Sequence, residues 1–176
     1  MKRHTVSQIK AHVRTLLREN RIRRPPVRVQ LIAKNLGIQI RHEPFEGAIS
    51  GVLYRDNNMT IIGVNSLHHR NRQRFTIAHE IGHLFLHEIE IHVDKGFRMV
   101  LRDSASSQAT DPKEIEANQF AAELLMPEHM LKQDMSEFLS DFENEAGLEK
   151  LANLYQVSTQ AMAFRLANLG VIKLEV

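Results

Sequence analysis

Apolar residues recur every three or four positions in several stretches of the chain, the pattern of helices that bury one face. One such stretch predicts a helix from about Asn71 to His87. Another predicts a helix that Asp111 caps, that has Pro112 in its first turn and that ends before Pro127. Shorter helices are predicted at 6–17, 27–36, 127–134, 136–145, 148–155 and 158–169.

Apolar and polar residues alternate ahead of the central helix, which is the pattern of strands. A strand is predicted at 38–41, and two more are predicted at 49–54 and 59–64. Asp56–Asn58 favours a turn, so these last two strands should form a hairpin. Residues 93–112 are mixed and polar, and they predict a long loop.

The order of these elements is helices, a small sheet and then helices again, which predicts an α+β fold with one layer of strands backed by helices. We expect a domain over residues 1–145 that contains the sheet and the central helix. Residues 146–176 are expected to form a helical hairpin that is packed on this domain or appended to it.

The composition narrows the possible chemistry. The chain has 176 residues, 43% of them hydrophobic, which is enough for a globular core, and it contains no cysteine. Disulfide scaffolds, thiolate metal sites and a cysteine nucleophile are therefore excluded. The N-terminal residues lack the apolar run of a secretory signal, and no stretch is long enough to span a membrane, so we expect a cytoplasmic protein.

Charge is divided unevenly along the chain. Residues 1–74 hold 15 Lys and Arg against 4 Asp and Glu, a charge of +11, whereas residues 75–176 carry −9. Such a split raises the question of nucleic-acid binding by the basic half. We interpret the basic stretch at Arg21, Arg23 and Arg24 instead as a docking surface for a partner protein.

The central helical stretch contains the motif H-E-x-x-H, from His79 to His83. Four residues make slightly more than one helical turn, so the two imidazoles should lie on one face, about 6 Å apart along the axis. Two neutral imidazoles so placed can bind one Zn²⁺. Glu80 should lie beside the metal, where it can take a proton from water. Apolar neighbours predict that this helix is buried, and a metal would then satisfy the buried polar groups.

A catalytic zinc site needs a third protein ligand and an open position for water. His87 follows at the same spacing, but on a continuous helix it would lie about 12 Å from His79, which tetrahedral zinc does not favour. The next long helix offers Glu114 and Glu116, and spacing alone does not choose between them.

Two segments resemble the ImmA/IrrE family of metallopeptidases. Residues 74–87, which include RFTIAHEIGH and a later LH pair, resemble the active-site helix of that family. Residues 116–127, EANQFAAELLMP, resemble its second motif. The similarity extends over roughly residues 5–172 and is weakest over 88–112 and 128–146.

This resemblance implies a zincin-like fold, with the small sheet beside the active-site helix. It implies that His79 and His83 bind Zn²⁺, that Glu80 is the general base and that Glu116, where the E-A-N-x-F-A pattern begins, is the third ligand. It also implies limited proteolysis of a helix-turn-helix transcriptional repressor, expected to be encoded nearby.

The working hypothesis is metal-assisted peptide hydrolysis, in which Glu80 passes the proton of water to the leaving nitrogen. An extended substrate is expected to pair with an edge strand near 59–64. His87, Arg74 and Tyr54 are candidates for contacts with the substrate or the developing oxyanion.

Two other functional hypotheses compete with the peptidase hypothesis. Residues 151–169 fit a helix-turn-helix, with Gln160, Arg165 and Asn168 as base-reading side chains, but they lie in the acidic half, so we do not expect direct DNA binding. The metal site could instead serve a non-hydrolytic sensor or a toxin–antitoxin type regulator. The intact Glu80 argues against that alternative.

Overall fold

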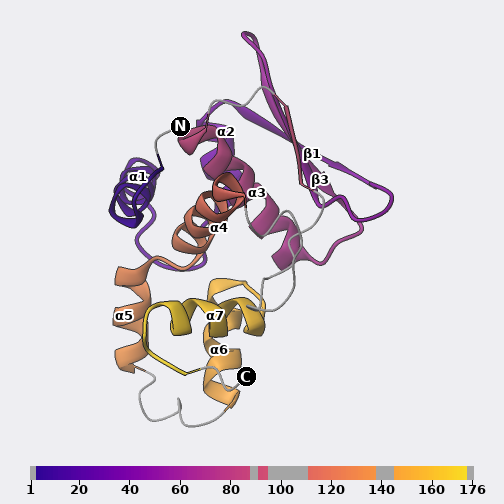
Figure 1. Ribbon diagram of the computed structural model, residues 1–176. Helices are drawn as coiled ribbons and strands as arrows, with labels where there is room; N and C mark the ends of the chain where they lie inside the picture. Colours follow the sequence, from indigo (N-terminus) through magenta and orange to yellow (C-terminus); the bar gives the residue numbers. More distant parts are fainter. Residues whose placement is uncertain (1–2, 88–90, 95–110, 138–144, 174–176) are drawn as a thin grey trace.

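A computed structural model describes residues 3–87, 91–94, 111–137 and 145–173 of the chain (Figure 1). These residues form an α+β fold, as expected. The elements are α1 (Val6–Glu19), α2 (Val29–Asn35), β1 (Ile38–Glu43), β2 (Gly51–Arg55), β3 (Thr60–Asn65), α3 (Arg70–Leu86), β4 (Ile91–Asp94), α4 (Pro112–Leu125), α5 (Glu128–Glu137), α6 (Glu145–Tyr155) and α7 (Thr159–Asn168).

The helix predictions are confirmed over most of their length. Asp111 caps α4 as expected, since its side chain accepts a hydrogen bond from the backbone N–H of Lys113 at 2.9 Å. Ser158 caps α7 in the same way, through the backbone N–H of Ala161. The helix predicted at 136–145 falls largely outside the described residues.

The sheet has four strands in the order β1-β3-β2-β4. The predicted hairpin is confirmed: β2 and β3 pair antiparallel, and Asp56 Oδ1 accepts hydrogen bonds from the backbone N–H groups of Asn58 and Met59 at 2.8 Å. β1 pairs parallel to β3, and β4 pairs antiparallel to β2. β4 was not expected, because four residues are too few for a readable alternation and its position is set by pairing with β2.

One expectation about the sheet is wrong. We expected residues 59–64 to be an edge strand that pairs with substrate, but β3 lies inside the sheet with β1 on one side and β2 on the other. Among the strands that the structure describes, the edges are β1 and β4.

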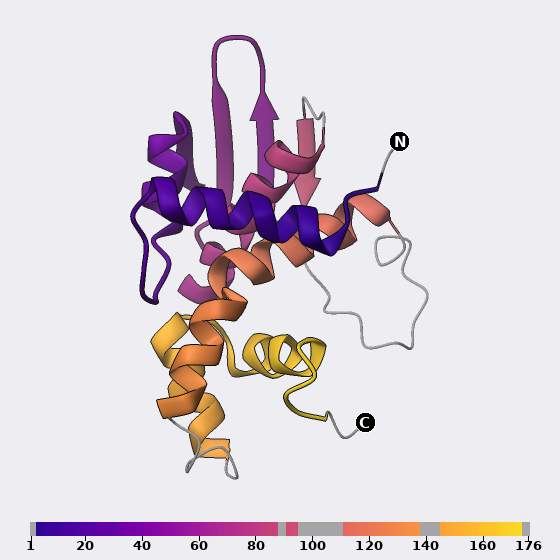
Figure 2. The same ribbon diagram turned by 90° about the vertical axis from the view of Figure 1, so that its left-hand side faces the viewer.

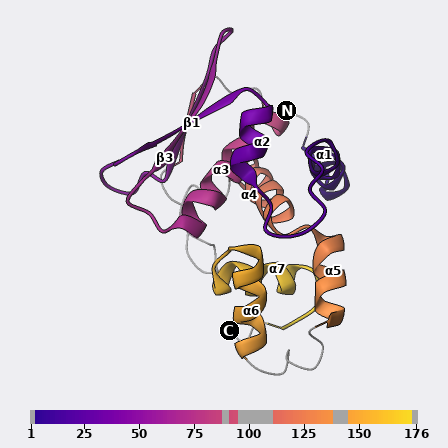
Figure 3. The ribbon, with the colours of Figure 1, turned by 180° about the vertical axis from the view of Figure 1, so that it is seen from behind.

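The helices lie on one side of the sheet, as opposite views show (Figures 1 and 3). Leu53, Ile62 and Val64 point toward them and are fully buried. α1 crosses α4 on the side of the helices away from the sheet, nearest the viewer in Figure 2, and its buried stripe packs against the core. That stripe is Ile9, Val13, Leu16 and Leu17.

α3 and α4 pack unusually closely because small residues meet at their crossing. A Cβ atom at Gly82 would lie 3.1 Å from Phe120 Cβ and 3.2 Å from Ala117 Cα, closer than ordinary packing allows. The absent side chain of Gly82 is therefore what lets the two backbones approach.

α6 and α7 are tied to the rest of the protein by two buried arginines. Arg165 of α7 pairs with Glu123 of α4 and donates to the carbonyl oxygen of Met126. Arg74 of α3 donates to the carbonyl oxygens of Tyr155 and Gln156. The division at residue 145 stays a prediction. No helix within the described segments has the length and apolar character needed to cross a membrane.

Replacing Gly82 with Val should lower the free energy of unfolding by about 1–3 kcal/mol, because the new methyl groups would force α3 and α4 apart. Chemical denaturation measures this change. Gln119→Val, at an exposed position on α4, is the control for a valine that meets no second helix. Valine has a higher helix propensity than glycine, so propensity cannot explain a loss of stability at position 82. An equal loss in both variants would contradict the packing explanation.

Candidate metal centre

α3 places His79 and His83 one turn apart on its buried side. Their side chains are 4% and 0% exposed, and their Nε2 atoms lie 3.0 Å apart. The two rings meet edge to face, with centroids 4.6 Å apart. Both Nε2 atoms thus face one small volume, as the H-E-x-x-H spacing predicted.

The third side chain at this point is Glu114, from the first turn of α4. Its Oε2 lies 3.3 Å from His79 Nε2, and its Oε1 lies 3.2 Å from His83 Nε2. The three residues offer ligand atoms that all lie within 4.8 Å of one another, so they could hold one metal ion.

This arrangement differs from the expectation that Glu116 would be the third ligand. Two residues along a helix rotate a side chain by about 200°, so Glu114 and Glu116 point in different directions. Glu114 shares the stripe of Ala117 and Asn118, which faces α3. The position of Glu114 three residues before Ala117 was a sequence signal that could have favoured it, since residues three apart share a helix face.

The donor chemistry of the three residues fits zinc. His79 Nδ1 lies 2.9 Å from Asn118 Oδ1, an acceptor, so this nitrogen carries the proton and Nε2 has the lone pair. Two imidazoles and one carboxylate are a ligand set of catalytic zinc sites, with a position left for water.

Glu80 is completely buried at the sheet side of α3. The first residue of β2 lies against it: a Cβ atom at Gly51 would lie 3.4 Å from Glu80 Oε1 and would overlap the methyl group of Thr76. Glycine at position 51 therefore lets the strand run directly past Glu80, which follows the metal-facing His79 in the chain.

His87 lies behind His83 rather than at the ligand cluster. Its Nδ1 is 3.1 Å from His83 Nδ1, and its Nε2 is 3.2 Å from Glu116 Oε2. Burial lowers the pKa of His87, and the Glu116 carboxylate opposes that shift. Glu116 Oε1 also accepts a hydrogen bond from the backbone N–H of His4 at 3.2 Å.

The other two candidate contacts lie elsewhere. Burial lowers the pKa of Arg74, whose guanidinium binds the backbone carbonyls at the α6–α7 turn and so is not directed at substrate. Tyr54 lies near the hairpin turn, where its hydroxyl donates to Asp56 Oδ2 at 2.9 Å. It is three residues along β2 from Gly51, or about 10 Å.

Comparison with known proteins places most of the chain in a family. The model of the IrrE N-terminal-like domain, peptidase family M78, matches residues 33–167. No curated protein matches the chain. Among solved structures, a Mycobacterium tuberculosis transcriptional regulator is similar, with a TM-score of 0.59 and 15% identity. The similarity covers 92% of this chain but only 46% of that one, and it shows a shared fold.

Replacing Glu114 with Ala should lower zinc affinity by more than about 100-fold, because a direct ligand is lost. Losing a residue that only hydrogen-bonds a ligand typically costs about 10–100-fold. Competition with a chromophoric chelator measures the affinity. Glu149→Ala, at an exposed position on α6, is the control. Retention of zinc by the Glu114 variant would exclude the ligand set described above.

Proposed function

Because the chain belongs to the family of IrrE N-terminal-like domains, a metallopeptidase family, we propose that it is a zinc-dependent endopeptidase. Its proposed substrate is a helix-turn-helix transcriptional repressor, cut at one site as a regulatory switch. The observation that carries this proposal is the convergence of His79, His83 and Glu114 beside the buried Glu80.

His79, His83 and Glu114 would hold the zinc ion. When bound, zinc supplies a Lewis acid that polarises a peptide carbonyl and makes water more acidic. Glu80 removes the proton from the attacking water and delivers it to the leaving nitrogen, so one carboxylate acts first as base and then as acid. Asn118 holds the ring of His79 in place during these steps.

The substrate strand is proposed to pair with β4, the sheet edge next to β2. Gly51 of β2 lies against Glu80, and Gly51 pairs with Asp94 of β4. β4 is thus the direct neighbour of β2, the strand that passes the proposed base Glu80. Addition of an extended peptide to such an edge provides main-chain hydrogen bonds that do not depend on sequence.

A regulatory protein substrate is in keeping with the comparison. The similar Mycobacterium tuberculosis protein is described as a transcriptional regulator, and this chain spans about half its length. Direct DNA binding by the chain itself has less support. Arg165, one of three candidate base-reading residues, is buried in its ion pair with Glu123.

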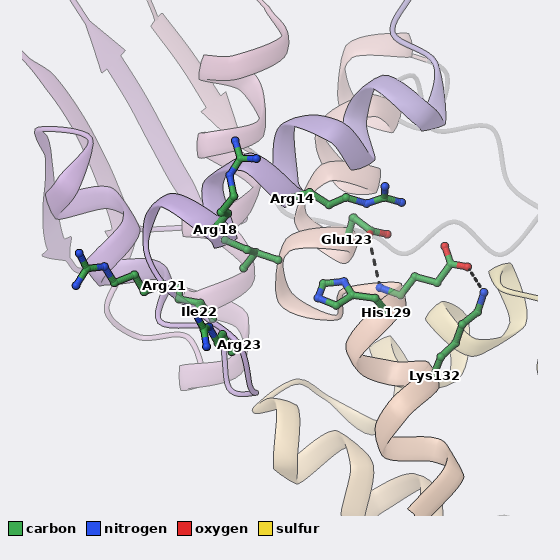
Figure 4. A pocket seen from close by; sticks show the side chains of 10 residues that line it. Arg14, Arg18, Arg21, Ile22, Arg23, Glu123, His129 and Lys132 are labelled. Atoms are coloured by element: carbon green, nitrogen blue, oxygen red, sulfur yellow. Dashed lines mark hydrogen bonds and ion pairs between the residues drawn. The ribbon is translucent and has the colours of Figure 1, made fainter.

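The basic N-terminal region forms one wall of a cleft of about 720 Å³ (Figure 4). Arg21 and Arg23, two of the three arginines expected to dock a partner, line it, whereas Arg24 does not. The remaining lining residues are Arg14, Leu17, Arg18, Ile22, Glu123, Glu128, His129 and Lys132.

Positive charge dominates the rim of this cleft. The two glutamates are engaged: Glu123 pairs with Arg165, and Lys10 and Lys132 lower the pKa of Glu128 to about 2. The cleft is therefore the proposed docking surface for an acidic face of the substrate protein, away from the metal cluster.

Glu80→Gln should keep its zinc and lose peptide cleavage by about 10²–10⁴-fold, because an amide cannot accept the proton of water. The measurements are zinc content and cleavage of the repressor encoded nearby, expressed together with each variant. Glu149→Gln is the control. Full cleavage by the Glu80 variant would exclude Glu80 as the general base, whereas no cleavage by the unchanged chain would favour a non-hydrolytic role.

Changing Arg21, Arg23 and Arg24 together to Gln should slow cleavage of the intact repressor by about tenfold or more at low salt, because electrostatic attraction speeds encounter. Cleavage of a short peptide that spans the cut site should not change. Arg41→Gln with Arg55→Gln, at exposed positions on the sheet, is the control. Unchanged cleavage of the repressor would exclude this docking surface.

A further inference from the structure

The two histidines of the metal cluster are supported from behind in different ways. His79 Nδ1 meets an amide oxygen directly, on Asn118. His83 Nδ1 instead meets a second imidazole, that of His87, which in turn meets the carboxylate of Glu116. The side chains of His83, His87 and Glu116 are all less than 10% exposed, so water competes little for these contacts.

We propose that Glu116 is a positioning residue that acts through His87 to determine which ring nitrogen of His83 carries the proton. This inference rests on the proposed zinc site, because its consequence is that the Nε2 lone pair of His83 is reserved for the metal. Glu116 would thus support the site without touching the ion.

The proton positions follow from the chemistry of the groups. An ionised carboxylate only accepts hydrogen bonds, so His87 Nε2 carries a proton and donates it to Glu116 Oε2. In a neutral ring the other nitrogen, Nδ1, then has the lone pair. His87 Nδ1 therefore accepts from the Nδ1–H of His83, and the lone pair of His83 Nε2 is left for the metal ion that His79, His83 and Glu114 would hold in place of a proton.

Position 116 needs two acceptor atoms. Glu116 Oε2 accepts from His87, while Oε1 accepts from the backbone N–H of His4. The ring of His4 is itself fixed, since its Nε2 lies 2.8 Å from the carbonyl oxygen of Leu86. A glutamine has one acceptor oxygen and one donor NH₂ group, so it cannot satisfy both neighbours.

A glutamine that keeps the His4 contact would turn its NH₂ group toward His87 Nε2. His87 would then carry its proton on Nδ1 and donate to His83 Nδ1. The proton of His83 would move to Nε2, the atom that faces Glu114, and would block metal binding there. The isosteric change Glu116→Gln would thus reverse the direction of both hydrogen bonds, from His83 to His87 and from His87 to residue 116.

The test of Glu116→Gln uses two measurements. Zinc affinity, measured by chelator competition, should fall by about 10–100-fold, the usual effect of losing a residue that supports a metal ligand through hydrogen bonds. Long-range ¹H–¹⁵N NMR of the metal-free histidine rings is recorded in a Glu114→Ala background, so that no carboxylate faces His83 Nε2. There, Glu116→Gln should move His83 from the Nδ1–H to the Nε2–H form. Gln119→Ala is the control on the same helix and should change neither value.

A rescue variant separates a role in proton placement from a role in packing. In the double variant His87→Asn, Glu116→Gln, the Asn oxygen takes the place of His87 Nδ1 and accepts from His83 without help, as Asn118 does for His79. We expect it to recover most of the zinc affinity. No recovery, or a loss of zinc in Glu116→Gln without a change of ring form, would overturn the proposal.

Failure of this inference can be told apart from failure of the proposed function. If Glu116→Gln binds zinc normally while Glu114→Ala does not, the positioning role is wrong and the metal site stands. If Glu114→Ala also binds zinc normally, the proposed site itself is wrong, and the positioning role falls with it.

Discussion

The close approach of α3 and α4 is the constraint on which the rest of the site depends. Gly82 and Ala117 have too little side chain to keep the helices apart, so the backbones nearly touch at this crossing. The metal-facing side chains come from both helices, two from α3 and one from α4. Their spacing is therefore set by helix packing, which a well-filled core holds more rigidly than a loop could.

A second close approach operates on the opposite side of α3. Gly51 lets β2 run past Thr76 and Glu80, so the carboxylate proposed as the general base is enclosed between sheet and helix. Gly82 on α3 and Gly51 on β2 thus each allow a close backbone approach at the site. Gly82 lets the proposed third ligand, Glu114, reach the histidines. Gly51 lets β2, the neighbour of the edge strand β4, lie beside the proposed base.

The fold and part of the site could be predicted from sequence because those features have local signals. The caps at Asp111 and Ser158, the hairpin turn and the H-E-x-x-H helix each depend on a few adjacent residues. The choice of Glu114 over Glu116 as the proposed third ligand depended on how α4 is rotated against α3, a tertiary property. β3 was misassigned as an edge because the order of strands is not written in any one strand. The burial of Arg74 depended on the α6–α7 turn, more than 80 residues away.

α1 connects the two places where a substrate protein would be held. His4, just before its first turn, contacts Glu116 beside the metal cluster, while Arg14 and Arg18 in its second half line the basic cleft. Fourteen residues separate His4 from Arg18, about 20 Å along a helix, which an extended chain covers in about six residues. If the cleft is the docking surface, a protein bound there would have to span a distance of this order to the metal cluster, which restricts how far its cut bond can lie from its docked face. The length of α1 would then help to select the cut site by its distance from the docked face of the substrate, as well as by its sequence.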